Sequence, residues 1–162
     1  MPGKMLLVRL FFMHLFFFAT TLLWGQQYNT WRYHNSYETS TAVEASDMAV
    51  WSASLTGLLR YDRASGEIET YDKTNGLSDV QIRQIAWNAE IESLVIAYEN
   101  SNIDLINDFG EVTNIPDILN STLTGSKLIN AIYTEGSKAY LSCDFGIVVV
   151  DLINFEIEAT YI

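Results

Sequence analysis

Hydrophobic and polar positions repeat along the chain with a period of about 44 residues, the length of one unit in several repeat architectures. Three segments each carry an apolar or aromatic residue, a turn residue six positions later, and an Asp or Asn five positions after that. The segments are 51–62, 96–107 and 140–151. Their turn residues are Gly57, Asn102 and Gly146. Because Gly and Asn enter left-handed backbone at low cost, we expect all three to form the same tight hairpin.

Further apolar segments flank each hairpin and complete the repeating unit. Upstream, each hairpin is preceded by an apolar segment and a polar turn, at 42–44, 82–87 and 129–133. Downstream, each is followed by an acidic and an apolar residue, at 67–68, 111–112 and 156–157. Each unit therefore predicts four short strands, the pattern of one β-propeller blade.

The fold class that this pattern favours is an all-β, partial β-propeller of about three four-stranded blades. The β-branched run Ile147–Val150 predicts a strand buried on both faces, while Ile103–Asn107 alternates more loosely. A β-sandwich is the alternative, but its strands recur every 8–12 residues or so without a longer period. Because propellers close with about four to eight blades, we expect the chain to be a fragment of a larger ring; self-association is the other route to closure.

The first 25 residues have the pattern of a secretory signal peptide. Lys4 and Arg9 supply positive charge before the apolar run Leu10–Trp24. We expect cleavage after Gly25, which leaves Gln26 at the new terminus and the blades in 26–162.

An uncleaved membrane anchor is the alternative interpretation of this segment. Arg9 and His14 shorten its apolar run below the ~20 residues that a membrane-spanning helix needs. Cleavage, with no stable membrane span afterwards, is therefore the favoured interpretation. Both interpretations export the rest of the chain, to the periplasm or the outer cell surface.

Charge and cysteine content exclude several classes of function. The net charge of −11 becomes −13 without Lys4 and Arg9, so a nucleic-acid partner is not expected. The single cysteine, Cys143, excludes an internal disulfide, and we expect it to be a buried strand residue. After cleavage His34 is the one remaining histidine, and no nucleophile elbow lies near it.

The other candidate motifs are explained by the turns and strands of β-propeller blades, without catalysis or ligand binding. Thr124–Lys127 lacks the upstream glycine and the following hydroxyl residue of a phosphate loop, so it predicts a turn. Carboxylates recur near the predicted blade turns, where solvated outer strands account for them without glycoside hydrolysis or calcium binding. These are Glu67, Glu69, Asp72, Asp104, Asp108, Glu111, Glu156 and Glu158. We therefore expect no catalytic residue, no metal and no cofactor.

Aromatic residues gather just before the first predicted blade. Trp31, Tyr33 and Tyr37 lie where an N-terminal strand would complete the last blade of a ring. Packing in that strand is the favoured role, because aromatic side chains dominate buried area. A platform for stacking sugars is the alternative.

Two sets of motifs resemble known propeller families. The stretch 75–86, Asn-Gly-Leu-Ser-Asp-Val-Gln-Ile-Arg-Gln-Ile-Ala, resembles the two-component regulator propeller repeat. The segments 94–106, 115–118, 139–142 and 145–149 resemble the N-terminal propeller of PorZ, a surface component of the type IX secretion system of Bacteroidota. The resemblance runs from about Trp31 to the end of the chain.

The resemblance implies a large protein with two propellers and a C-terminal domain, of which this chain lacks the second propeller and that domain. It implies a non-catalytic scaffold in the complex that attaches exported cargo to anionic lipopolysaccharide, with glycan and secretion-complex proteins as partners. No glycan-contacting residue can be carried over to this sequence. An extracytoplasmic sensor propeller of a hybrid two-component regulator is the alternative. A propeller hydrolase would need acids clustered at the central channel, a pattern that the sequence does not reveal.

Overall fold

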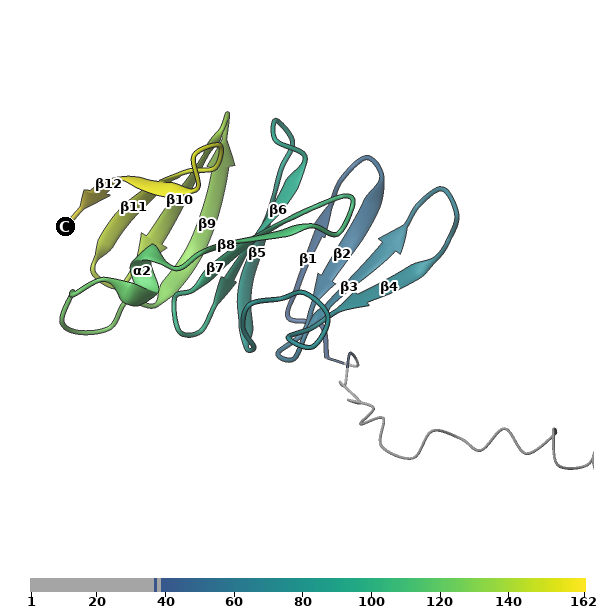
Figure 1. Cartoon of the computed structure of the whole chain (residues 1–162), viewed down its shortest axis with the longest axis horizontal. Helices are drawn as coiled ribbons and strands as arrows, with labels where there is room; N and C mark the ends of the chain where they lie inside the picture. Colours follow the sequence, from purple (N-terminus) through teal and green to yellow (C-terminus); the bar gives the residue numbers. More distant parts are fainter. Residues whose placement is uncertain (1–36, 38) are drawn as a thin grey trace, which may run out of the picture. The chain divides into compact units, whose positions relative to one another are not determined.

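A computed structural model describes residue 37 and residues 39–162 of the chain (Figure 1). The expected cleavage site at Gly25 and Gln26 lies outside the described residues, as do Trp31, Tyr33 and His34. Within the described part, no helix is both long and apolar enough to cross a membrane.

Within the described residues, twelve strands form three four-stranded antiparallel sheets, in the order of the chain. The first sheet contains β1 (Ala42–Ala45), β2 (Ala49–Ala53), β3 (Leu58–Asp62) and β4 (Ile68–Tyr71). The second contains β5 (Ile82–Asn88), β6 (Ser93–Tyr98), β7 (Ile103–Asn107) and β8 (Val112–Ile115). The third contains β9 (Ile129–Glu135), β10 (Lys138–Cys143), β11 (Gly146–Asp151) and β12 (Glu156–Tyr161), and the short helix α2 (Asp117–Asn120) precedes it. The predicted three blade-like units are confirmed.

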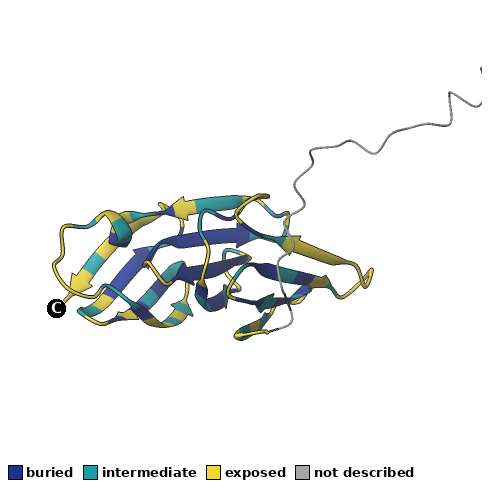
Figure 2. Cartoon of the chain, turned by 90° about the horizontal axis from the view of Figure 1, so that it is seen from below, coloured by how far each residue is buried: buried dark blue, intermediate teal, exposed yellow. Residues whose placement is uncertain are grey.

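The sheets pack face to face, and the second lies between the other two (Figure 1). Strands β1, β5 and β9, the first of each sheet, contact one another in succession. Successive propeller blades are arranged in this way around a central channel. Figure 2 shows that burial is concentrated on the middle strands, whereas the turns are exposed.

Burial along each strand follows its position between the sheets. Every residue of β6 is buried, because the second sheet is covered on both faces. In β11 the run Val148–Val150 is buried, but Ile147 is 50% exposed. The expectation that Ile147–Val150 is buried throughout was therefore wrong at its first residue. Ile147 lies at the start of β11, opposite Tyr161 of β12, and Tyr161 is exposed as well.

In each sheet, the recurring Asp or Asn at the end of the third strand holds the turn that follows. The side-chain Oδ1 atoms of Asp62, Asn107 and Asp151 each accept hydrogen bonds from two backbone N–H groups, two to four residues later. Asx turns of this kind fix a short connection with the chain's own side chain. The repeat in the sequence is thus a repeat of turn chemistry.

The predicted hairpin residues lie at the connections between the second and third strands, where Gly57 and Asn102 precede the third strand and Gly146 begins it, but they differ in conformation. Of the three, only Gly146 has a positive φ, at 145°. Beside Asn102 it is Ser101 that has the left-handed φ, at 70°. Gly57 is needed for a close approach instead, because a Cβ atom there would lie 2.6 Å from the backbone oxygen of Tyr71. The single shared hairpin conformation that we expected was therefore wrong.

Candidate functional site

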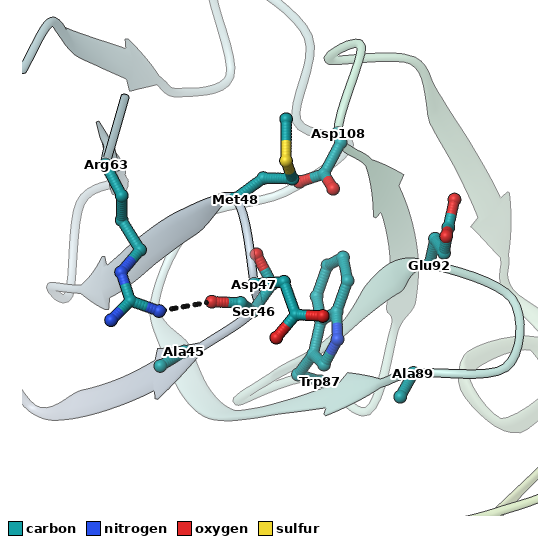
Figure 3. Close-up of a pocket in the computed structure, with 9 residues that line it drawn as sticks. All are labelled: Ala45, Ser46, Asp47, Met48, Arg63, Trp87, Ala89, Glu92 and Asp108. Atoms are coloured by element: carbon teal, nitrogen blue, oxygen red, sulfur yellow. Dashed lines mark hydrogen bonds between the residues drawn. The ribbon is translucent and has the colours of Figure 1, made fainter. Parts of the chain in front are cut away.

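A pocket of about 370 Å³ opens between the first and second sheets, at the end of the sheets that carries the β1–β2 turn (Figure 3). Four turns line it: β1–β2 and β3–β4 from the first sheet, and β5–β6 and β7–β8 from the second. The lining residues are Ala45, Ser46, Asp47, Met48, Arg63, Trp87, Ala89, Glu92 and Asp108. Figure 3 shows Arg63 and Glu92 at opposite ends, with Asp47, Trp87 and Asp108 between them.

Each of the four turns is held by a side chain that bonds to its own backbone. Ser46 Oγ accepts a hydrogen bond from the Ala49 N–H at 2.9 Å. Asn88 Oδ1 accepts hydrogen bonds from the backbone N–H groups of Glu90 and Ile91. Asp62 and Asn107 hold the other two turns, as described above. A lining residue directly follows each of these capping residues. The turns that line the pocket are therefore fixed by the chain's own side chains.

Arg63 joins the two turns of the first sheet at the pocket wall. Its guanidinium Nη1 donates a hydrogen bond to the backbone oxygen of Ser46 at 3.0 Å, drawn dashed in Figure 3. Its backbone N–H donates to the backbone oxygen of Met48 at 2.9 Å. Part of the hydrogen-bonding capacity of this cation is thus used in holding the wall together.

Asp108 places a partly buried carboxylate in the pocket. Burial raises the pKa of Asp108 above its usual value, the nearby Arg60 guanidinium lowers it, and the carboxylates of Glu92 and Asp62 raise it further. Its Oδ1 atom is buried and has no hydrogen-bond partner among the described residues. A buried acceptor without a donor is costly, and such groups in a folded protein call for an explanation.

A buried cation lies between the sheets near this pocket. Arg60 is 7% exposed, its guanidinium lies 5.6 Å from the ring centre of Trp51, and it pairs with Glu69 at 3.2 Å and Asp62 at 3.3 Å. Tyr71 donates its hydroxyl proton to Glu69 at 3.0 Å, and its pKa is raised to about 12, first by burial. The first and second sheets thus enclose charged as well as apolar groups.

The pocket also has an aromatic wall and apolar edges. Trp87 is half-buried, and its backbone oxygen accepts a hydrogen bond from Thr134 Oγ1 of β9 at 2.9 Å. Met48 is 56% exposed, and Phe109, next to Asp108 in the β7–β8 turn, is 90% exposed. An indole, several carboxylates and exposed apolar side chains form a surface suited to binding, because tryptophan offers an apolar face beside polar groups.

Two residues considered from the sequence, Cys143 and Lys127, have structural surroundings. Cys143 is 8% exposed, and burial raises the pKa of its thiol to about 11, which keeps it in the unreactive thiol form. Lys127 donates hydrogen bonds to the backbone oxygens of Leu119 and Ser121, at 3.1 and 2.7 Å. Among the described residues, no group of three His, Cys, Asp or Glu side chains is placed to hold a metal ion.

Two of the recurring carboxylates contradict the expectation of solvated outer strands: Asp72, which follows β4, is 8% exposed, and Asp104 of β7 is buried completely. The Asp104 carboxylate accepts hydrogen bonds from the Tyr98 hydroxyl at 2.6 Å, the Ser78 N–H at 2.8 Å and Asn114 Nδ2 at 2.8 Å. Asp104 therefore ties the segment after β4 to the second sheet. The expectation was wrong for Asp104 because β7 lies inside the packed sheets, where a charge persists only when it is bonded.

Sequence reasoning did not identify the pocket. Asp108 was considered only as one of many carboxylates, and Asp47, Trp87 and Glu92 were not singled out. The signal that could have found three of the positions is their place directly after the capping residues Ser46, Asn107 and Asp62, at Asp47, Asp108 and Arg63.

Comparison with known proteins identifies the family. Residues 50–162 match the family model described as the type IX secretion system PorZ N-terminal beta-propeller domain. Among solved structures, PorZ of Porphyromonas gingivalis, described as an essential bacterial surface component of the type-IX secretion system, is 30% identical with a TM-score of 0.71. That match covers 75% of this chain and 16% of that one.

A second structure resembles the chain in fold alone. It is the extracellular domain of a protein from B. thetaiotaomicron described as a hybrid two component system, with 15% identity and a TM-score of 0.55. The match covers 75% of this chain and 17% of that chain. No curated protein sequence matches. The family match over residues 50–162 places this chain in the family of PorZ N-terminal β-propeller domains of the type IX secretion system.

Proposed function

We propose that the protein is a non-catalytic surface scaffold of a type IX secretion and attachment complex, which binds a partner at the face formed by its β1–β2, β3–β4, β5–β6 and β7–β8 turns. The family match carries this proposal. The pocket of about 370 Å³ on that face supports it, because loops on a rigid frame commonly carry binding residues.

A protein partner fits this pocket better than anionic lipopolysaccharide does. Asp47, Glu92 and Asp108 give the lining three carboxylates. Among the described lining residues the cation is Arg63, which bonds to the pocket wall. An anionic glycan would meet like charge here, and juxtaposed like charges oppose binding. If the protein supplies glycan in the complex, the glycan would therefore bind elsewhere on it.

Export through the signal peptide at 1–25 and exposure at the outer surface belong to the same proposal. They are supported by the described surface position of the P. gingivalis relative. The sensor-propeller alternative has only fold similarity in its favour, since the two-component relative is 15% identical.

Site-specific cross-linking in cells tests the proposal. A photo-reactive amino acid replaces Phe109, which is 90% exposed beside the pocket, and the matched control replaces Leu55, which is 59% exposed in the β2–β3 connection. We expect secretion-complex proteins to be recovered from the Phe109 position far more than from Leu55. Gene deletion should also release cargo from the cell surface. Normal cargo attachment after deletion, with no cross-links from Phe109, would overturn the proposal.

A further inference from the structure

We infer that the pocket between the first and second sheets receives the cationic side chain of an arginine or lysine from a partner protein, while apolar neighbours of that residue pack on Met48 and Phe109. This inference rests on the proposed function, because it names the chemistry of the partner that the turn face would bind. Nothing in the family description assigns a ligand to this pocket.

The charge of the lining selects a cation. Asp47, Glu92 and Asp108 contribute carboxylates, while the Arg63 guanidinium is bonded to the Ser46 backbone oxygen. The chain as a whole carries a net charge of −11, so a basic partner is attracted before contact as well as within the pocket. A basic side chain is therefore the complementary ligand, and an anionic group is disfavoured.

Two groups in the pocket suit such a ligand. Asp108 is partly exposed in the lining, and its carboxylate can accept hydrogen bonds from a guanidinium or ammonium group, which brings several donors. The half-buried indole of Trp87 lines the same pocket, and a cation placed over an indole face is stabilised by the ring. Together they provide a hydrogen-bond acceptor and a ring face for one charged head group.

The size and edges of the pocket suit a protein side chain. A volume of about 370 Å³ lies at the lower end of the range for ligand pockets, enough for a single extended side chain. Met48 and Phe109 are 56% and 90% exposed at the surrounding turns. Exposed apolar side chains around a charged cavity are typical of protein contacts, in which apolar neighbours exclude water from a central anchor.

A hollow between the second and third sheets shows that several carboxylates are not a general feature of the spaces between these sheets. Leu105, Leu152, Ile153 and Phe155 line it, together with a single carboxylate from Glu111, in a volume of about 380 Å³. That carboxylate already accepts a hydrogen bond from Asn107 Nδ2 at 2.8 Å. The several carboxylates and the indole are thus features of the pocket between the first and second sheets in particular.

Binding of short peptides to the whole protein tests the inference. The probe is acetyl-Leu-Arg-Leu-amide, and the control is the same peptide with citrulline, which is close in shape to arginine but neutral. The indole N–H signal of Trp87, identified by its loss in Trp87→Phe, reports binding by nuclear magnetic resonance. We expect the arginine peptide to bind about tenfold more tightly than the citrulline peptide, the size of one good charged contact.

Substitutions that keep side-chain shape locate the contact. Asp108→Asn and Glu92→Gln should each weaken binding of the arginine peptide by about fivefold, because each removes one charge from the pocket. Glu156→Gln, at an exposed position on β12, is the matched control and should change nothing. Thermal unfolding of each variant confirms that it is folded.

Equal binding of the two peptides, or no binding of either, would contradict the inference. A Trp87 shift caused by galacturonate but not by the arginine peptide would contradict it too, and would assign the pocket to anionic sugars. The cross-linking from Phe109 tests the proposed function separately. If Phe109 cross-links to secretion proteins but the arginine peptide binds no better than the citrulline peptide, only the inference is contradicted. If the arginine peptide binds better but those cross-links are missing, only the proposed function is contradicted.

Discussion

The two interfaces between the sheets have the same architecture but different side chains. The core between the second and third sheets consists of aliphatic and other small residues, among them Leu141, Val150 and Cys143. The core between the first and second sheets contains the large aromatics Trp51 and Tyr98. Among the described residues, the buried members of the core between the second and third sheets include no aromatic ring, and the partly buried Phe145 packs against it.

One buried and one partly buried charge lie on the same side as the aromatics. Arg60, packed against Trp51, is 7% exposed, and the carboxylate Asp108 lies near it in the adjoining pocket. Buried ion pairs contribute little net stability, because desolvation offsets their attraction. The charged groups between the first and second sheets thus exceed what packing requires. The comparison teaches that, when one interface between repeats contains aromatic and charged residues that its neighbour lacks, that interface is the better candidate for a functional site.

The largest expected effect is on the aromatic core. Trp51→Ala should lower the free energy of unfolding by about 3–5 kcal/mol, since it empties a large buried volume and removes the ring that Arg60 contacts. Leu141→Ala, in the aliphatic interface, is the matched comparison and should cost about 2–4 kcal/mol. Urea unfolding measures both. A cost of Trp51→Ala well below that of Leu141→Ala would mean that the first interface is not a true core.

The next effect concerns the buried carboxylate of the second sheet. Asp104→Asn should cost about 2–3 kcal/mol, because an amide group offers one acceptor oxygen where the carboxylate receives bonds from three donors. Tyr98→Phe removes only one of those bonds and should cost about 1 kcal/mol. Equal, small losses from both substitutions in urea unfolding would show that Asp104 does not hold the segment after β4.

Turn glycines provide a smaller contrast. Gly146→Ala should cost about 2–3 kcal/mol, because the position has a φ of 145° and a Cβ atom would collide with the backbone oxygen of Tyr161. At Gly125 φ is also positive, at 103°, but nothing lies within 4 Å of a Cβ atom. Gly125→Ala should therefore cost only about 1 kcal/mol. Indistinguishable costs in urea unfolding would mean that the close approach at Gly146 contributes nothing.

The smallest effect, and the one with the opposite sign, is expected in the pocket. Burial raises the pKa of Asp108, so the folded chain holds this proton more tightly than the unfolded chain does. Stability therefore falls as the pH rises from the ordinary carboxyl pKa through the raised value. Asp108→Asn removes this loss and should leave the free energy of unfolding at pH 7 unchanged or higher, with no such gain below pH 4 or so. A clear loss of stability at pH 7 would indicate a structural role for Asp108.

The sequence was sufficient for the fold because the fold depends on local chemistry. The capping residues Asp62, Asn107 and Asp151 recur at one place in each unit, and each acts on the turn directly beside it. The exact turn conformations were harder to predict. At the second hairpin the left-handed residue is Ser101 rather than Asn102, and amino-acid composition alone does not distinguish these two positions.

The pocket was beyond the sequence because it forms only when two sheets meet. Asp47 and Asp108 lie in turns of different sheets, and their shared pocket follows from how those sheets pack. The burial of Asp104 was missed for a related reason, since a strand's position within the packed sheets decides which polar residues lose water. Local patterns thus predicted the units, while contacts between units determined the candidate site.

The most direct test compares, in living cells, the pocket between the first and second sheets with the apolar hollow between the second and third sheets. One strain carries Glu92→Gln with Asp108→Asn in the pocket. The other strain carries Ile153→Ala with Phe155→Ala in the apolar hollow. The amount of cargo attached to the cell surface is measured in both, at matched levels of the protein. The account predicts that attachment falls in the first strain and stays normal in the second. Normal attachment in the first strain with loss in the second would contradict it.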